Sequence, residues 1–399
     1  RCLAVTGVQT CALPICGAAV TEEFCPGFRN SVAAYTVSLL NPQIISDLKL
    51  ADHGLRIVER RAQNFLPAPD GSHLLTGEGR TQQSVAKLSP HDAAAIGAFS
   101  GELEAIADVL RQFVLRAPPN LVEGFGIGAI SEVFNALGTA NILRRLSLEQ
   151  QRNLLDLFTR SAGEMLDERF DNDLVKALFG FDAIVGNYAS PYAAGSAYVM
   201  LHHAFGEVNG KKGVWGHAIG GMGAITQAMA RAARSHGVEI ETDAPVREVI
   251  VENDRATGVI LDSGETVRAK YVVSNVNPKL LYTRLVPEGA LAGEFRTRIS
   301  RWQNGSGTFR MNVALSALPS FTALPGPGDH LTAGIIIAPS LGYMDRAWRD
   351  AREFGWSRAP VVELLIPSTL DDSLSPPGQH VASLFCQHVA PQLPGGKSW

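Results

Sequence analysis

The chain has 399 residues, of which 46% are hydrophobic and 19% charged, and its net charge is −4 at pH 7. This length allows two or three domains with substantial cores, and the composition is that of an ordinary folded protein. A negative net charge argues against a nucleic-acid partner, because such partners normally require a basic protein face. No apolar run is long enough to cross a bilayer, so no transmembrane span is expected.

Residue usage suggests a source and a compartment. Arginine greatly outnumbers lysine and alanine is abundant, which indicates a GC-rich bacterial genome. The 5 cysteines form neither a zinc-ligand spacing nor a disulfide framework. We therefore expect a cytoplasmic bacterial protein without a metal site, and peripheral contact with a membrane stays open.

The first fifteen residues are expected to be foreign to the natural chain. Val5–Ile15 reads VTGVQTCALPI, which resembles the translation of a common sequencing-adapter read, and such segments are excluded from fold reasoning. A signal peptide is the alternative, although polar residues and a proline interrupt its apolar core. If the segment is foreign, Cys11 and Cys16 are not the redox pair that their spacing suggests.

Turn signals interrupt the first half of the chain at two places. Asp70-Gly71 lies between two apolar runs and predicts a β-hairpin. Gly124–Ala129 matches the G-x-G-x-x-[GA] pattern that binds dinucleotides, but only between a strand and a helix. Pro118-Pro119 precede it and helical patterns flank it, so we interpret it as a turn between helices.

The region from 90 to 205 is expected to be mostly helical. A serine, a proline and an acid at 89–92 predict a helix start, and that helix should run to about Leu115. A capping box at 147–150 opens another helix, expected to continue through Leu166.

The most informative stretch is residues 213–278. Gly220, Gly221 and Gly223 allow a tight turn without side chains where a helix begins. Apolar residues then recur at helical spacing until Gly237, which predicts the end of the helix.

Strand patterns follow that helix. Val238–Thr242 alternates as a strand, and Val246–Val251 with Thr257–Leu261 frames a hairpin. Tyr271–Val273 is a short apolar run, which predicts a strand covered on both faces. Further strand-like runs, split by proline and glycine, predict a second sheet crossed by a helix near Tyr343–Phe354. These runs are Phe309–Leu315, Gly334–Ile337, Val361–Ile366 and His380–Cys386.

The 213–278 stretch resembles the part of phytoene-desaturase-like flavoproteins where the chain returns to the FAD domain. Four other segments extend the resemblance over nearly the whole chain, together with Gly395–Trp399. These segments resemble the pyridine nucleotide-disulfide oxidoreductase domain-containing protein 2 group, a branch of the carotenoid/retinoid FAD-dependent oxidoreductases. These segments are Gly17–Phe28, Ser38–Leu50, Ser190–His203 and Ile366–Gln387.

The resemblance implies an α/β fold: an FAD-binding Rossmann-like domain of the amine oxidase/phytoene desaturase type, N-terminally truncated, with a mixed-sheet substrate domain and a helical cap. The implied divisions are 16–52 for the remnant of the FAD domain, 53–89 for a substrate-domain segment, 90–212 for the cap, 213–285 for the return to the FAD domain, and 286–399 for the substrate-domain sheet.

The resemblance also implies the cofactor and its contacts. The cofactor is FAD, the Val246 main chain reaches the adenine, and Ser274 with Asn275 ends a strand near the nucleotide. Gly17 corresponds to one of two glycines near the diphosphate, and Cys16 stands in the place of the other. The three glycines at 220, 221 and 223 let backbone approach the cofactor.

Two family segments are expected to be missing. The family opens with a strand and a G-x-G-x-x-G turn that anchors the FAD pyrophosphate, and it closes with a glycine-rich segment beside the flavin. Because neither is found here, this chain is expected to be an inactive fragment that binds FAD poorly.

Three side chains are candidates for the substrate channel: Tyr192, Tyr198 and His202. Packing is the alternative for each, and no residue is assigned as a general base. The parent protein is expected to be an FAD-dependent oxidoreductase that transfers hydride from a small apolar substrate to flavin, with an unknown electron acceptor. A redox-neutral flavin-dependent isomerase and a non-catalytic interaction protein of the same fold are the alternatives.

Overall fold

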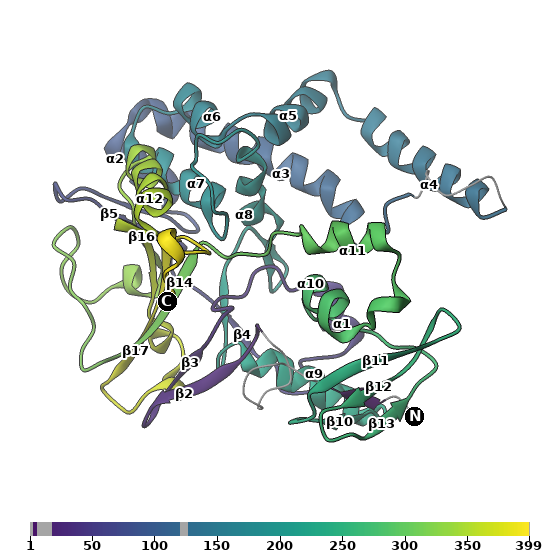
Figure 1. Cartoon of the computed structure of the whole chain (residues 1–399). Coiled ribbons are helices and arrows are strands. Elements are labelled where there is room, and N and C mark those ends of the chain that lie inside the picture. The colour runs from purple at the N-terminus through teal and green to yellow at the C-terminus, as the bar shows by residue number, and fades with distance from the viewer. Residues whose placement is uncertain (1–2, 6–17, 120–126, 399) are drawn as a thin grey trace.

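The computed structural model describes residues 3–5, 18–119 and 127–398. A mixed sheet and the helices packed on it form one body, and a glycine-turn unit with a small antiparallel sheet forms another (Figure 1). The prediction about residues 1–15 falls mostly outside the described residues. Within them, β1 (Leu3–Val5) pairs in parallel with β10 (Glu239–Glu241).

The large sheet has six strands in the order β14–β17–β16–β15–β5–β6. The β15–β5 pair is parallel and the other neighbouring pairs are antiparallel, which confirms a mixed sheet. The four strand runs expected between Phe309 and Cys386 are all present, and so is the hairpin at Asp70-Gly71, where Gly71 has φ +87°. The strands are β5 (Asn64–Pro67), β6 (His73–Leu75), β14 (Thr308–Leu315), β15 (Gly334–Ile337), β16 (Trp356–Leu365) and β17 (His380–Val389).

Helices cover one face of this sheet and extend beyond it. Ser89 caps α3 through the Asp92 amide at 3.1 Å, as the sequence predicts. The helix expected from 147 to 166 is instead two helices, because Arg160 is extended and Ser161 caps a new start. The helices are α2 (Thr81–Leu88), α3 (Pro90–Val114), α4 (Ile127–Arg144), α5 (Leu148–Thr159), α6 (Ala162–Arg169), α7 (Asp173–Ile184), α8 (Leu201–Phe205) and α12 (Leu341–Phe354).

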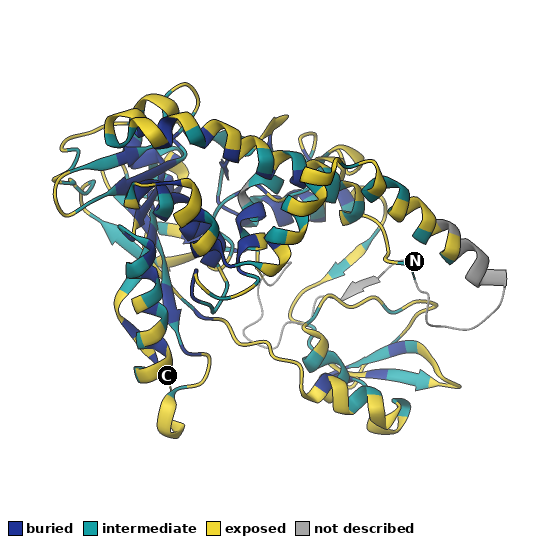
Figure 2. Cartoon of the chain, turned by 90° about the horizontal axis from the view of Figure 1, so that it is seen from above, coloured by how far each residue is buried: buried dark blue, intermediate teal, exposed yellow. Residues whose placement is uncertain are grey.

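The main core lies between these helices and the sheet. Figure 2 shows the buried residues concentrated there. Phe99 contacts Phe170 and Phe179 edge-on, with ring centroids 5.3 and 5.0 Å away, and the latter two rings stack. Such aromatic pairs contribute beyond their buried area, so this trio fixes α3 against α7. In the described residues, no helix is both long and apolar enough to cross a bilayer.

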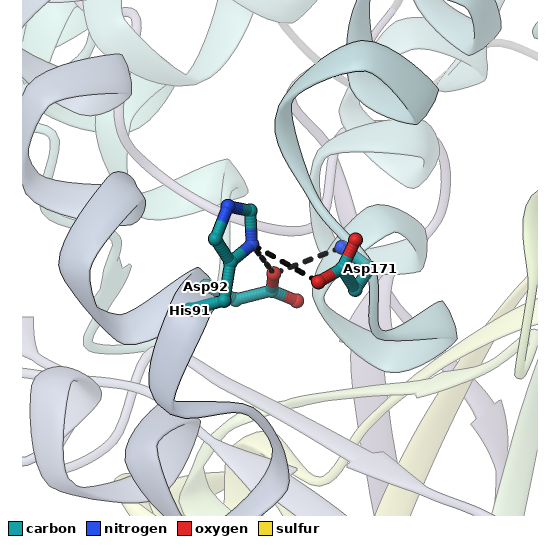
Figure 3. Close-up of side chains that lie close together, drawn as sticks. All are labelled: His91, Asp92 and Asp171. Atoms are coloured by element: carbon teal, nitrogen blue, oxygen red, sulfur yellow. Dashed lines mark hydrogen bonds and ion pairs between the residues drawn. The ribbon is translucent and has the colours of Figure 1, made fainter.

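A buried carboxylate also joins α3 to the start of α7 (Figure 3). The backbone amides of Asp171 and Asn172 both donate to Asp92 at 2.8 Å. His91 Nδ1 lies 3.1 Å from Asp92 Oδ1 and 3.1 Å from Asp171 Oδ2. Burial acts to raise the pKa of Asp92, but these hydrogen bonds outweigh it and the pKa is lowered. The cluster therefore has a structural role, because it ties α3 to the start of α7.

The glycine-turn unit is built around α9 (Gly223–Ser235), which ends before Gly237 at φ +79°, as expected. Its core is a separate cluster of small and aliphatic side chains. The other elements are α1 (Pro42–Asp47), the hairpin β2 (Thr21–Cys25) with β3 (Phe28–Ser31), and the pair β4 (Ile57–Glu59) with β9 (Gly216–Ala218).

The small sheet follows α9 and confirms the expected hairpin. It consists of β11 (Val246–Glu252), β12 (Arg255–Leu261) and β13 (Thr266–Arg268). The strand expected at Tyr271–Val273 is wrong: the segment is irregular, and Tyr271 and Val273 are 73% and 94% exposed. No strand lies beside it in the part of the chain that the structure describes, so its backbone groups have no ladder to join.

Short elements complete the chain. They are β7 (Glu207–Val208), β8 (Lys211–Lys212), α10 (Pro278–Leu280), α11 (Gly293–Ser300), the π-helix η2 (Leu281–Leu285), and the 3₁₀ helices η1 (Ala197–Met200), η3 (Glu288–Ala290), η4 (Asp329–Thr332), η5 (Pro367–Thr369), η6 (Asp372–Leu374) and η7 (Pro394–Gly396).

Candidate functional site

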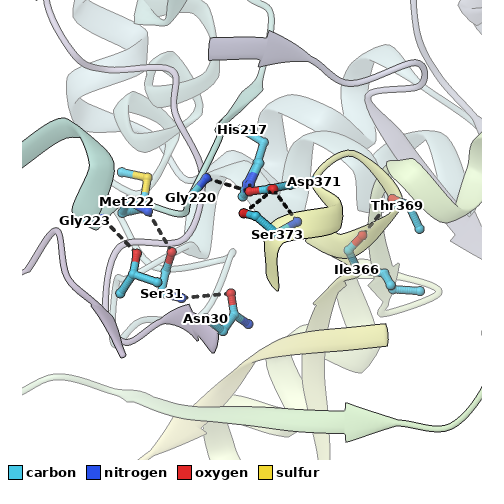
Figure 4. Close-up of polar contacts among 11 residues, drawn as sticks. Asn30, Ser31, His217, Gly220, Met222, Gly223, Ile366, Thr369, Asp371 and Ser373 are labelled. Atoms are coloured by element: carbon cyan, nitrogen blue, oxygen red, sulfur yellow. Dashed lines mark hydrogen bonds and ion pairs between the residues drawn. The ribbon is translucent and has the colours of Figure 1, made fainter. Parts of the chain in front are cut away.

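Three backbone amides of the glycine turn before α9 donate hydrogen bonds to side-chain oxygens (Figure 4). The Gly220 amide donates to Asp371 Oδ2 at 2.7 Å, and the Met222 amide donates to Ser31 Oγ at 3.0 Å. The Gly223 amide donates to Thr21 Oγ1 at 2.9 Å. Free amides at a helix start commonly bind anions, but these three already have acceptors.

Asp371 connects this turn to the C-terminal part of the chain. It is buried and also accepts hydrogen bonds from Ser373 and from His217 Nε2, the latter at 3.0 Å. Burial alone would raise the pKa of Asp371, but the bonds from His217, Ser373 and Gly220 lower it to about 2. The charged carboxylate therefore links two parts of the chain that are far apart in sequence.

Two of the three glycines are required by close packing. A Cβ on Gly221 would lie 2.4 Å from Thr21 Oγ1, and one on Gly223 would lie 2.8 Å from the Thr21 backbone nitrogen. A Cβ on Gly220 would meet only Ala224, at 3.6 Å. The hairpin β2–β3 thus fills the space that the resemblance gives to a cofactor at positions 221 and 223.

Two cavities share one wall, and the smaller of them lies beside the turn. The smaller has a volume of about 390 Å³ and the larger about 870 Å³, which are sizes typical of ligand sites. Arg60, Asn64 and Asp182 line both cavities. The smaller cavity reaches the glycine turn through Met222, whereas the larger lies under helices α3 and α7.

The shared wall continues into a polar cluster formed by Tyr35, Arg60, Arg310 and Glu363, which we name the junction cluster. Arg60 and Glu363 are buried, and Tyr35 and Arg310 are half-buried. The Tyr35 hydroxyl donates to Glu363 Oε2. Arg60 Nη2 donates to Thr36 Oγ1 at 2.6 Å, and the Arg310 guanidinium lies 4.2 Å from the centre of the Tyr35 ring. Buried charged groups are costly, so such a cluster is a candidate functional site.

Burial sets the protonation of the junction cluster. It raises the pKa of Glu363 and, together with the nearby Glu363, raises the pKa of Tyr35 well above its ordinary value. It lowers the pKa of Arg60, and the Glu363 carboxylate acts in the opposite direction. The charge of Arg60 is therefore supported by Glu363, whereas the Tyr35 hydroxyl stays protonated and can donate.

The expected cofactor contacts remain predictions. Val246 pairs with Leu261 at the edge of the small sheet and lines neither cavity. Ser274 and Asn275 are exposed in the irregular segment after Tyr271. Gly17 lies outside the described residues, as do residues 124–126 of the G-x-G-x-x-[GA] match.

The three substrate-channel candidates are placed in different surroundings. His202 lines the smaller cavity, and its ring centroid lies 5.4 Å from that of Trp215. Tyr192 donates to Asp167 Oδ2 at 3.0 Å, and burial together with this carboxylate raises the pKa of Tyr192 to about 12. Tyr198 stacks on Phe158 at 5.6 Å. Neither tyrosine lines the two cavities.

Sequence reasoning missed the junction cluster and Asp371. The residues come from segments hundreds of positions apart, so no local motif joins them. One signal was readable: Glu363 interrupts the apolar run from Val361 to Ile366, and a charged residue in a buried strand is uncommon.

Residues 67–308 match the family model for flavin containing amine oxidoreductases, so the chain belongs to that family and is an oxidoreductase with a flavin cofactor. It is 36% identical over 402 aligned residues to the rat pyridine nucleotide-disulfide oxidoreductase domain-containing protein 2, and 35% identical to the mouse protein. The alignment covers 96% of this chain and 69% of each relative. The resemblance inferred from the sequence is thereby confirmed, whereas these mammalian relatives give no support to a bacterial source.

Solved structures show the same fold. An oxidoreductase from Methanosarcina mazei matches with a TM-score of 0.56 at 15% identity, over 94% of this chain and 71% of that one. A variant of putrescine oxidase matches with a TM-score of 0.54 at 15% identity, over 96% and 69%. The expected α/β flavoprotein fold is confirmed.

The described residues fit a flavin in one place. The smaller cavity has an apolar side formed by Ala34, Val37 and Val185, and a polar side at the junction cluster. A flavin ring likewise has an apolar and a polar edge. The glycine turn does not fit a phosphate group, because its amides are occupied.

Proposed function

We propose that the protein is an FAD-dependent oxidoreductase that takes hydride equivalents from the apolar part of a small organic substrate. One observation supports this most directly: two ligand-sized cavities meet at the shared wall of Arg60, Asn64 and Asp182. In this proposal the flavin ring occupies the smaller cavity, and the substrate occupies the larger one.

The walls of the two cavities suit these occupants. Ile96 and Leu103 of α3, with Leu178 and Phe179 of α7, give the larger cavity an apolar side. Met222 and Trp215 flank the smaller cavity. A bound flavin accepts a hydride from a substrate C–H bond, while the protein supplies orientation and excludes water. The electron acceptor that follows would be oxygen, a quinone or another carrier.

Flavin titration with two matched tryptophan variants tests the proposal. Ala34 lines only the smaller cavity and Ser100 only the larger. Lumiflavin, which is the ring alone, should bind with its fluorescence quenched; Ala34→Trp should weaken this binding at least tenfold and Ser100→Trp should not. Because the turn amides are occupied, FAD should bind no more than a few-fold tighter than lumiflavin.

Two results would contradict the proposal. If Ala34→Trp binds lumiflavin as the unaltered chain does, the ring site is elsewhere. If FAD binds at micromolar or tighter concentrations while lumiflavin does not bind, the dinucleotide contacts dominate and the smaller cavity is not the main site.

A non-catalytic protein that keeps the flavoprotein fold is the second candidate. The occupied amides of Gly220, Met222 and Gly223 favour it, because they offer no phosphate site. Absence of binding by FAD and by lumiflavin would support this candidate. A redox-neutral isomerase would use the same cavities and would show flavin binding without net oxidation of its substrate.

A further inference from the structure

We propose that Arg60 binds the carboxylate of an amphipathic substrate whose apolar chain lies in the larger cavity. The inference rests on the proposed function, which makes this cavity the substrate chamber. It adds the chemical class of the substrate: a hydrocarbon chain that carries an acid group.

The first argument is the number of unused donors on Arg60. A guanidinium has five N–H donors and no acceptor. Thr36 Oγ1 accepts from one of the Arg60 donors at 2.6 Å, and the nearby Glu363 carboxylate favours the charged form of Arg60. Arg60 is only 7% exposed and lines both cavities, so its remaining donors have the cavities as their surroundings. Planar carboxylates match this donor geometry.

One carboxylate lies beside the two guanidiniums of the junction cluster. Its Oε2 accepts from the Tyr35 hydroxyl, and its charge favours the charged form of Arg60. Arg310 adds a second guanidinium, whose Nε and Nη1 are buried and have no hydrogen-bond partner. Gly334 leaves the room between the charges: a Cβ there would lie 2.5 Å from Glu363 Oε1 and 3.2 Å from Arg60 Nη1. The junction cluster thus has two guanidiniums for one carboxylate.

Three of the four other cations that line the larger cavity are paired, and the fourth, Arg61, is exposed. Lys211 lies 2.9 Å from Glu59, Lys212 lies 2.7 Å from Asp108, and Arg80 lies 3.1 Å from Asp329. These pairs are at least partly exposed, so they contribute little to selection of an anion. Arg60 differs because it is buried, and it lines the same cavity as the apolar side chains of α3 and α7.

An amine is the rival ligand, because Asp182 also lines both cavities. The test therefore uses three probes with the same chain length: laurate, dodecanol and dodecylamine, each below its aggregation concentration, titrated calorimetrically into the flavin-free protein. Laurate should bind at least tenfold tighter than dodecanol, and dodecylamine should bind no tighter than dodecanol.

Two arginine variants make the test specific. Arg60→Gln should lower laurate affinity at least tenfold and leave dodecanol affinity unchanged, whereas Arg61→Gln is the matched control, since Arg61 lines the same cavity but is exposed. Arg60→Lys keeps the charge without the planar fork and should give an intermediate loss. If circular dichroism shows that Arg60→Gln is unfolded, Arg60→Lys serves as the test variant in its place.

The outcomes separate this inference from the proposed function. Dodecylamine binding tighter than laurate, or equal laurate affinity in Arg60→Gln and the unaltered chain, would overturn the carboxylate site. Laurate binding that depends on Arg60 in a protein that binds no flavin would keep the site and reject the oxidoreductase proposal. Flavin binding in a protein that takes no laurate would do the reverse.

Discussion

Asp371 links three parts of the chain through one carboxylate. It receives hydrogen bonds from His217, from Gly220 at the start of the α9 turn and from Ser373. Its folded-state pKa of about 2 lies below the ordinary value of 3.8, so its contribution to stability is complete above pH 4 and is lost as the pH falls towards 2. The difference corresponds to about 2 kcal/mol.

We expect Asp371→Asn to lower the free energy of unfolding by about 1–3 kcal/mol at pH 7, because the buried donors lose a charged acceptor. The variant should also lose part of the acid dependence of stability between pH 4 and pH 2. Urea unfolding across this pH range measures both effects. The exposed neighbour Asp372 provides the control, Asp372→Asn, and equal stability of the two variants would contradict the assignment.

The glycines of the turn allow a second test at the residue scale. Gly220 and Gly221 both have positive φ, so an alanine at either position is strained by about 1 kcal/mol. Only at Gly221 does the added Cβ also collide with Thr21. We expect Gly221→Ala to be more destabilising than Gly220→Ala by about 1–3 kcal/mol in chemical denaturation. The opposite order would show that β2 does not pack there.

At the scale of elements, contact between α7 and α12 depends on Gly180. A Cβ at this position would lie 2.3 Å from Leu341 Cδ2 and 3.3 Å from Met344 Sδ. Gly180→Ala should therefore destabilise the protein by about 1–3 kcal/mol, despite the higher helix propensity of alanine. When Leu341→Ala is combined with Gly180→Ala, the methyl group added at position 180 should be better tolerated. A double-mutant cycle would measure this coupling.

Gly97 in α3 is the matched control for that prediction. It is exposed, and nothing lies within 4 Å of the position that a Cβ would take. Gly97→Ala should stabilise the protein by about 0.5–1 kcal/mol through helix propensity alone. If thermal unfolding shows that Gly180→Ala and Gly97→Ala change the stability in the same direction, the packing of α7 on α12 is contradicted.

Elements with local signals were predictable from the sequence, and elements that depend on distant partners were not. The serine caps of α3 and α5 and the glycine stop after α9 are local features, and each is confirmed. Tyr271–Val273 has the composition of a buried strand, yet a strand also needs a neighbouring edge. The helix expected to end at Leu166 stops at Thr159, because Ser161 offers a competing cap.

For the whole molecule, the sequence indicated the family but not the site. The resemblance identified the flavoprotein fold, and the glycine turn was located correctly. It could not show that Thr21, Ser31 and Asp371 occupy the turn amides, because those residues come from distant segments. The junction cluster was missed for the same reason: Tyr35, Arg60 and Glu363 meet only after the sheet and the glycine-turn unit have come together.

The central claim is that a flavin cavity and a substrate cavity share the wall of Arg60, Asn64 and Asp182. The most direct measurement is the absorption spectrum of bound lumiflavin during a titration with laurate. We predict that laurate shifts the flavin bands, that the shift saturates at the laurate concentration found by calorimetry, and that Ser100→Trp removes it. Laurate that binds with undiminished affinity and leaves the flavin spectrum unchanged would contradict the shared wall.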